Sequence, residues 1–185
     1  MNSNYGQCSL FLHPVQHDFT VREPSSLLSE LKNINFISQT IENSSGFDYF
    51  TGDKFLDYVA YMGCAPAIQF EANTAGENFC HIKIQQFDSV KLIHSRIQAR
   101  APHCPHCGKP VKNWQQNRNE TTILCELCAT TSNIAEFNWR KMAGYARLFI
   151  EITDIFPKEA TPQQSLLDKL SAITEVEWVY FYSCS

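Results

Sequence analysis

The chain has 185 residues, of which 44% are hydrophobic and only 18% charged, and its formal net charge is −4. This length suffices for one or two globular domains that fold without disulfide bonds. The composition excludes a highly charged disordered chain and a protein that is basic throughout and coats nucleic acid. The first cation is Arg22 and no apolar run approaches about 20 residues, so we expect a cytoplasmic protein with reduced thiols and no secretory signal or membrane span.

The N-terminal half predicts short strands and two helices. Ser9–Leu12, which runs into His13-Pro14, has the features of a strand that ends at a proline. Leucines at helical spacing predict a helix at Ser25–Ile34, and a second helix is expected at Asp53–Met62, before Gly63. Three further strands are predicted, at Ala67–Ala72, Phe79–Ile84 and Val90–Ile97, the first two joined by a hairpin loop.

The C-terminal third predicts a β-α-β unit. Tyr145–Thr153 alternates apolar residues as a strand does. Thr161 is the expected N-cap of a helix that has Pro162 at its first position and ends at Ile173. Val176–Ser183 closes the unit as a strand with aromatic or apolar residues on both faces, which indicates either a covered central strand or an edge strand that a partner covers.

An internal repeat suggests how these elements combine. Residues 26–34 and 165–173 both read S-L-L-x-x-L-x-x-I, and each follows a strand and a proline. This repeat favours a two-layer α+β sandwich of the ferredoxin-like, split β-α-β type. Residues 1–100 and 135–185 would then form one domain, with residues 101–134 inserted. The alternative is that the two helices share leucine spacing only because both are amphipathic.

Eight cysteines divide into two groups. Cys104, Cys107, Cys125 and Cys128 form the pattern C-x2-C-x17-C-x2-C, which is the spacing of a four-thiolate zinc site. Gly108 follows the first pair and can adopt the positive φ common after such a turn, whereas the second pair is followed by alanine. The remaining cysteines are scattered and are expected to be packing thiols: Cys8, Cys64, Cys80 and Cys184.

Residues 101–134 therefore resemble the zinc-ribbon or rubredoxin-like knuckle class. The resemblance implies one structural Zn²⁺ held by the four cysteines, with iron or a redox dithiol as alternatives. His103 and His106 flank the first pair but are not needed as ligands. Beyond the knuckles, residues 137–141, 145–153 and 178–182 resemble a proteobacterial zinc-ribbon protein family with no assigned activity, so this resemblance implies no reaction.

The charge is distributed unevenly along the chain. Residues 89–118 contain six Lys or Arg and no acidic residue, so this segment carries +6 and the rest of the chain −10. We expect Lys109, Lys112, Trp114 and Arg118 to face a partner, either a protein complex or RNA. The alternative is that the cations only compensate the −2 charge of a zinc ion bound by four thiolates.

Catalytic motifs are weak by comparison. The chain has no glycine-rich phosphate loop, so a nucleotide cofactor is unsupported. An enzyme would have to use Cys64, Cys80 or His81. Because neighbouring residues of a strand face opposite sides, the adjacency of Cys80 and His81 does not make them a catalytic pair. His13, His17 and His81 could form a second metal site, but three independent polar histidines are the favoured interpretation. The sequence thus favours a non-catalytic zinc-binding adaptor over an enzyme or an RNA-binding protein.

Overall fold

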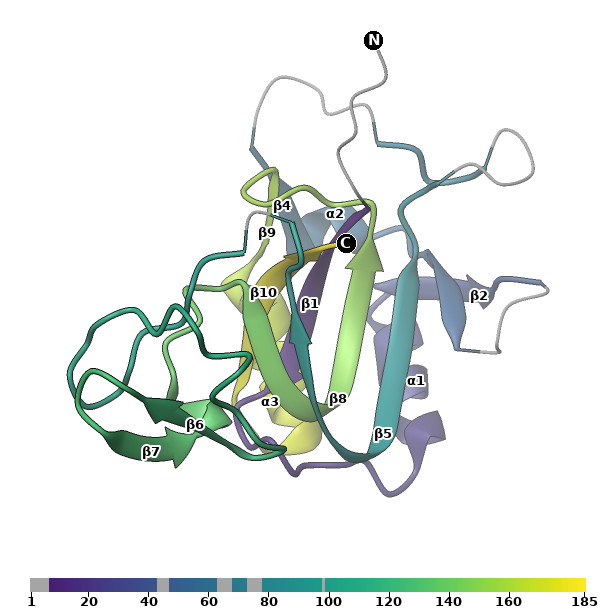
Figure 1. The fold of residues 1–185 in the computed structure, drawn as a ribbon. Coiled ribbons are helices and arrows are strands. Elements are labelled where there is room, and N and C mark those ends of the chain that lie inside the picture. Colours follow the sequence, from purple (N-terminus) through teal and green to yellow (C-terminus); the bar gives the residue numbers. More distant parts are fainter. Residues whose placement is uncertain (1–6, 43–46, 63–67, 73–77, 98) are drawn as a thin grey trace, which may run out of the picture.

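The computed structural model describes residues 7–42, 47–62, 68–72, 78–97 and 99–185. Its centre is a mixed α/β fold built on a six-stranded antiparallel sheet with the order β10-β1-β8-β5-β3-β2 (Figure 1). The strands of this sheet are β1 (Cys8–Pro14), β2 (Ile37–Thr40), β3 (Asp48–Thr51), β5 (Ile82–His94), β8 (Ala143–Thr153) and β10 (Trp178–Cys184). The first and last strands of the chain are therefore neighbours.

Two helices cover one face of this sheet. α1 (Pro24–Asn33) buries Leu27 and Leu31, and α3 (Gln164–Thr174) buries its own leucines against the same core. These are the two segments that share the leucine repeat, so the helices expected at Ser25–Ile34 and Pro162–Ile173 are both found, the second with a later start. The sheet contributes alternate residues to this core, Leu10 and Leu12 from β1 among them, and they are fully buried.

The opposite face of the sheet is also apolar. Phe11, Phe149 and Phe181 form a separate buried cluster there, with the rings of Phe11 and Phe181 stacked at 5.0 Å between centroids. Trp178 from β10 lies in the helix-side core, while Phe181 of the same strand lies in this second cluster. Both faces of the last strand thus contribute to a core, but β10 is an edge strand, so the alternative of a central strand is wrong.

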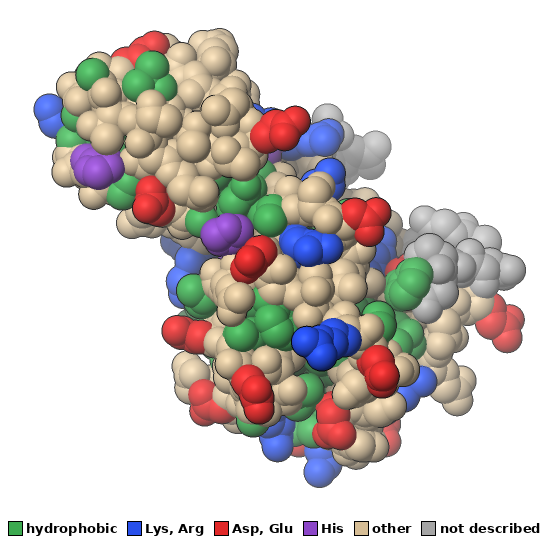
Figure 2. Space-filling model, turned by 90° about the horizontal axis from the view of Figure 1, so that it is seen from below, with side chains coloured by type: hydrophobic (Ala, Val, Ile, Leu, Met, Phe, Trp, Pro, Cys, Tyr) green, Lys and Arg blue, Asp and Glu red, His purple; other side chains and the backbone are tan. Residues whose placement is uncertain are grey.

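The long strands β5 and β8 carry the chain to a smaller lobe. Their pairing is interrupted by a bulge between Gln86 and Lys91, and it resumes up to His94 and Ala143. We call residues 99–142, between β5 and β8, the four-cysteine module; it contains the hairpin β6 (Thr122–Cys125) and β7 (Thr130–Asn133) and the short 3₁₀ helix η1 (Ile134–Glu136). Figure 2 shows it as a lobe projecting from the main body.

Several local expectations were wrong. The helix expected at Asp53–Met62 is found only as the short helix α2 (Phe55–Tyr58), because the next residues form the strand β4 (Val59–Tyr61). β4 pairs with β9 (Ala160–Pro162), so Thr161 is a strand residue, and Gln163 is the N-cap of α3. Pairing between segments about 100 residues apart has outweighed the local capping signal.

The strands expected in the middle of the chain also differ. The separate strands expected at Phe79–Ile84 and Val90–Ile97 are one continuous strand, β5. Residues 68–72 of the expected strand Ala67–Ala72 are not in a strand, and residue 67 and most of the hairpin loop lie outside the described residues. The hairpin of β2 and β3 was not expected at all.

A disulfide joins Cys8 to Cys184, which face each other in the register of β1 and β10. The expectation that both are reduced packing thiols is therefore wrong. The sequence carries no local signal for this bond, because its two residues are 176 positions apart and meet only when the terminal strands pair. Disulfides persist mainly in oxidising compartments. This bond therefore gives no support to the expected cytoplasmic location, which remains a prediction. No helix in the described residues is long and apolar enough to cross a membrane.

Candidate metal centre

The first cysteine knuckle is a tight turn at the start of the module. The amide of Gly108 donates to the carbonyl of Cys104 at 3.0 Å, and the amide of Cys104 donates to the carbonyl of Lys109 at 3.0 Å. Gly108 has φ = +69°, as its position after the cysteine pair predicts. The amide of His106 points at the Cys104 sulfur, 3.4 Å away. These bonds turn the sulfurs of Cys104 and Cys107 toward one point.

The second knuckle is the turn of the β6–β7 hairpin. Cys125 ends β6, and Cys128 stands two residues before β7 begins at Thr130. Ala129 has φ = +54°, so it takes the left-handed conformation that Gly108 takes after the first pair. An L-residue with a Cβ is strained in this conformation. The two knuckles thus share one backbone shape despite their different sequences.

The four sulfurs form a compact cluster, all within 4.8 Å of one another. The Cys104 and Cys128 sulfurs are 3.7 Å apart, and those of Cys107 and Cys125 are 3.8 Å apart. A tetrahedral ion with metal–sulfur bonds of about 2.3 Å requires sulfur–sulfur distances of about 3.8 Å. The residues therefore fit a metal ion, and the four cysteines expected to act together do lie together. The geometry alone does not select zinc over iron.

The surroundings of the sulfurs favour thiolates unequally. Hydrogen bonds from the hydroxyl and amide of Thr130 lower the pKa of Cys128 to about 6. Burial away from water raises the pKa of Cys125 to about 11. A bound cation would stabilise all four thiolates, and binding would therefore release protons to solvent.

Neither histidine near the first knuckle belongs to the sulfur cluster. The main chain of His103 forms isolated β-bridges with Pro110 and Asn138, and His106 is exposed. Among the His, Cys, Asp and Glu residues that the structure describes, the four cysteines are the group that could hold a metal ion. His13, His17 and His81 are all described and do not form such a group.

The module has a small apolar core of its own under the sulfurs. Ile123 and Ile134 are fully buried, and the indoles of Trp114 and Trp139 meet edge to face at 4.9 Å. The Trp139 indole N–H donates to the carbonyl of Ile134 at 3.0 Å. Trp114 is only 6% exposed, so the expectation that it faces a partner is wrong: its ring is part of this core. Tyr145 of β8 belongs to the same cluster and attaches the module to the sheet.

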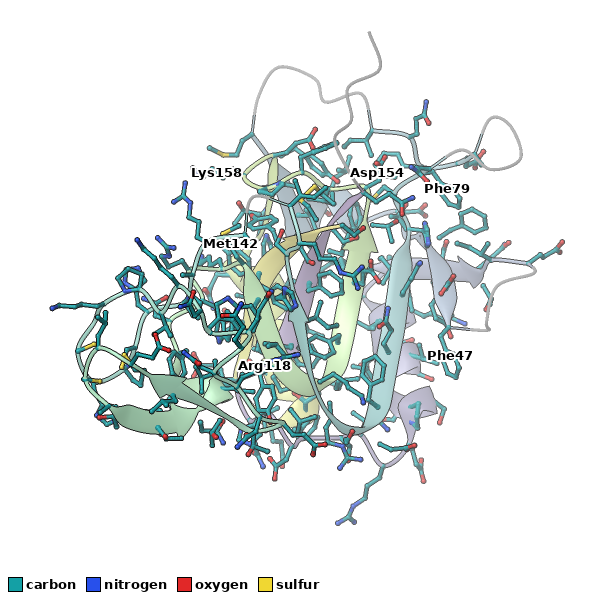
Figure 3. All side chains as sticks on the ribbon, in the orientation of Figure 1. Phe47, Phe79, Arg118, Met142, Asp154 and Lys158 are labelled. Carbon is teal, nitrogen blue, oxygen red and sulfur yellow. A yellow bond between two sulfur atoms is a disulfide. The ribbon has the colours of Figure 1, made fainter. Side chains whose placement is uncertain are left out.

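The remaining expected partner residues are all exposed but do not form one patch. Lys109 and Lys112 line a pocket of about 360 Å³ beside the second knuckle. Arg118 is outside that lining; its guanidinium lies 5.5 Å from the Trp114 ring centroid, on the side of the module that faces the sheet (Figure 3). Leu127, which was not among the expected partner residues, lines the same pocket and is 65% exposed. Its position in the turn between Cys125 and Cys128 was the available signal.

The candidate catalytic residues are not brought together. Cys80 is fully buried in the main core, and burial raises the pKa of its thiol to about 12. His81, the next residue, instead contacts the hydroxyl of Thr153, with 2.9 Å between the His81 Nδ1 and Thr153 Oγ1 atoms. Cys64 lies outside the described residues. The described part of the chain thus offers no thiol–imidazole pair from these residues.

Comparisons with protein-family models, curated proteins and solved structures found no match to this chain. The resemblance to zinc ribbons consequently rests on the spacing of the cysteines and the compatible geometry of their sulfurs. The resemblance of the whole chain to a proteobacterial family gains no support.

Proposed function

We propose that this protein is a non-catalytic, zinc-binding adaptor that docks on a partner protein through the exposed end of its four-cysteine module. The observation that carries the proposal is Leu127, 65% exposed on the second knuckle and grouped with Lys109 and Lys112 around one pocket. Glu126 also lines this pocket, so the two cations and one carboxylate leave it with a net charge of +1. An exposed large apolar side chain beside a net positive charge suits a partner that offers an apolar contact and acidic groups. Zn²⁺ is proposed because closed four-thiolate sites most often hold it.

The proposal is tested by comparing three forms of the full chain as bait in native lysate. One form is wild type, one carries Lys109→Glu, Lys112→Glu and Leu127→Asp, and the matched control carries Lys54→Glu and Leu56→Asp. Leu56 is 53% exposed on the main domain, so the control makes the same kinds of change elsewhere. We expect a specific partner protein to be retained by wild type and control and lost from the first variant. Retention of the same proteins by all three forms would remove docking through the module.

The metal assignment has its own measurement. Elemental analysis of protein purified without added metal should give one zinc per chain, and Cys104→Ser with Cys125→Ser should abolish it. If the protein instead contains one iron per chain and shows a visible charge-transfer band, the metal is iron in a rubredoxin-like site and the zinc assignment is wrong.

RNA binding is the less favoured role for the same exposed cations. Trp114, the aromatic expected to stack on bases, is buried, and Arg118 is apart from Lys109 and Lys112. RNA binding by the wild-type chain that weakens steeply with salt, and weakens further when these three cations are neutralised, would overturn the protein-docking proposal.

We also infer that the main domain has the split β-α-β topology. The inference is supported by the strand order: β8 and β10 flank β1, both antiparallel to it, and the chain between them passes through α3. β1 and β5 likewise flank β8, and the chain between them passes through α1. The hairpin of β2 and β3 would then be an addition at the β5 edge. Interstrand NOEs from β1 to both β8 and β10 would support this topology, and direct β8–β10 pairing would exclude it.

A further inference from the structure

The last strand of the chain, β10, is an edge strand whose outer side is only partly used. Within the main chain, the amide of Tyr182 donates to the carbonyl of Lys141 at 2.9 Å. Two residues further along β10, the amide of Arg96 donates to the carbonyl of Cys184 at 2.8 Å, and the Cys184 amide donates to the Ser95 hydroxyl. The even-numbered residues of β10 therefore direct their main-chain groups away from β1.

This alternation extends to the first half of the strand. In antiparallel pairing, successive residues direct their N–H and C=O groups alternately toward one neighbour and the other. Trp178 and Tyr180 therefore also present their main-chain groups outward, while Glu177 accepts a bond from Val15 on the β1 side. Within the described residues, no hydrogen bond to the outward main-chain groups of Trp178 or Tyr180 is found. The N–H and C=O groups of these two residues thus have no partner in the described part of the chain, and those of Tyr180 are the accessible ones, because Trp178 is only 2% exposed.

A groove of about 440 Å³ runs beside these open groups, bounded by α3 on one side and Lys141 at one end. Trp178 and Leu167 supply buried apolar surface to it, at 2% and 9% exposure. α3 packs beside this edge strand, on the face of the sheet that the helices cover. A strand edge next to a helix offers both main-chain bonds and a surface for side chains.

The rim of the groove is acidic on balance. Asp168 and Glu177 are exposed, and neither has an ion-pair partner among the described residues. The one cation, Lys141, is engaged: its ammonium donates to the Tyr180 hydroxyl at 2.5 Å and lies 3.9 Å from the centroid of that ring. A basic side chain on an occupant would therefore meet two carboxylates.

We propose that this groove binds an extended, basic peptide segment of a partner protein, which adds to the sheet as a short strand beside β10. Its main chain pairs with Tyr180, and alternate side chains face α3, where a Lys or Arg contacts Asp168 or Glu177. The main-chain hydrogen bond from Tyr182 to Lys141 blocks further pairing along β10, so only a short strand fits. For the same reason a second copy of this chain could pair over just two outward residues, too few for the area that a stable dimer buries.

The test selects a displayed library of random octapeptides on the immobilised, metal-loaded full chain. We expect enriched peptides to carry Lys or Arg and to lack proline at alternate positions. The Asp168→Lys and Glu177→Lys double variant should weaken binding of a selected peptide by about tenfold. The matched control, Glu23→Lys with Glu30→Lys on the α1 side, should bind as wild type does. Saturating peptide should also slow hydrogen exchange at the Tyr180 amide in the wild-type chain.

Three results would overturn the proposal: no enrichment of basic peptides, equal binding by the two double variants, or unchanged exchange at Tyr180. A concentration-dependent dimer that the Asp168 and Glu177 changes abolish would assign the edge to a second copy instead. The outcome is independent of docking through the four-cysteine module, because Lys109→Glu, Lys112→Glu and Leu127→Asp should leave peptide binding unchanged.

Discussion

At the scale of single residues, Gly144 is required because aromatic rings occupy the space where a Cβ would lie. A Cβ built at this position would be 2.2 Å from Phe181 Cε1 and 2.8 Å from His13 Cδ2. Gly144→Ala should therefore lower the free energy of unfolding by about 2 kcal/mol, as overpacked cores do. Urea unfolding measures the change, and Phe181→Leu in the same chain should recover part of it. An unchanged midpoint would contradict the close approach of β8 and β10.

His13 makes the stability of the fold depend on pH. It lies between Phe149 and Phe181, and its Nδ1 donates to the carbonyl of Pro14 at 2.9 Å. Burial lowers its pKa from 6.5 to about 4. Between these two values the unfolded chain binds the proton and the folded chain does not, so stability falls as pH drops from 6.5 toward 4.

The free energy of unfolding falls by on the order of 3 kcal/mol once the pH is below the pKa of the folded state, because each pKa unit corresponds to about 1.4 kcal/mol. Carboxylates contribute their own pH dependence, so the measurement compares wild type with His13→Phe, which keeps an aromatic ring at this position. Urea unfolding at pH 7 and pH 4.5 should show a smaller loss in the variant. Equal losses would mean that His13 is not the buried neutral base described here.

Ala129 is the counterpart of Gly108 in the second knuckle, and it carries the strain that glycine avoids. Its φ of +54° is unfavourable for any residue with a Cβ. Ala129→Gly should stabilise the metal-bound module by about 0.5 to 1 kcal/mol, and Gly108→Ala, at φ = +69°, should destabilise it. Competition with a chelator measures both changes, and effects of the same sign in the two variants would contradict the shared backbone shape.

At the scale of elements, we expect the four-cysteine module to depend on the proposed metal far more than the sheet does. Its buried core is small, whereas the main domain has an extensive apolar core between sheet and helices. Chelation should therefore unfold the module first and leave the six-stranded sheet intact.

The three tryptophans make this order measurable. Trp114 and Trp139 are in the module, and Trp178 is in the main core. In a Trp178→Phe chain, a strong chelator should shift the fluorescence emission to longer wavelength, because both remaining indoles become hydrated. In a chain with Trp114→Phe and Trp139→Phe, the emission of Trp178 should stay unchanged. Simultaneous changes in both chains would show that module and sheet unfold together.

The elements that the sequence predicted well are those whose apolar spacing is strong and local. α1, α3, β1, β8 and β10 have clear helical or alternating patterns, and the clustered cysteines have a spacing that few other structures require. The elements that it missed are short or depend on distant partners. β4 exists through its pairing with β9, and β2 and β3 have four residues each. A lone tryptophan in a basic segment, such as Trp114, carries no periodic signal that distinguishes core from surface.

At the scale of the whole molecule, the disulfide between Cys8 and Cys184 fixes both ends of the described chain in neighbouring strands. The same end of β10 accepts main-chain bonds from Arg96 and Ile97, where the chain leaves β5 toward the module. The bond thus ties together the first strand, the last strand and the entry to the module. Because the bond joins residues 176 positions apart, it removes the entropy of closing a long loop from the unfolded chain.

Replacing both cysteines by serine should lower the free energy of unfolding by about 2 to 5 kcal/mol, the range for closing a long loop. Urea unfolding in the presence of excess zinc measures this loss without a contribution from the module. A reductant should then lower the stability of wild type and leave the double variant unchanged, since the variant has no bond to reduce. The metal content should stay the same in both chains, because the four-cysteine site is separate from the bond. A stability that is equal in the two chains under oxidising conditions would show that the terminal strands are held by their ladder alone.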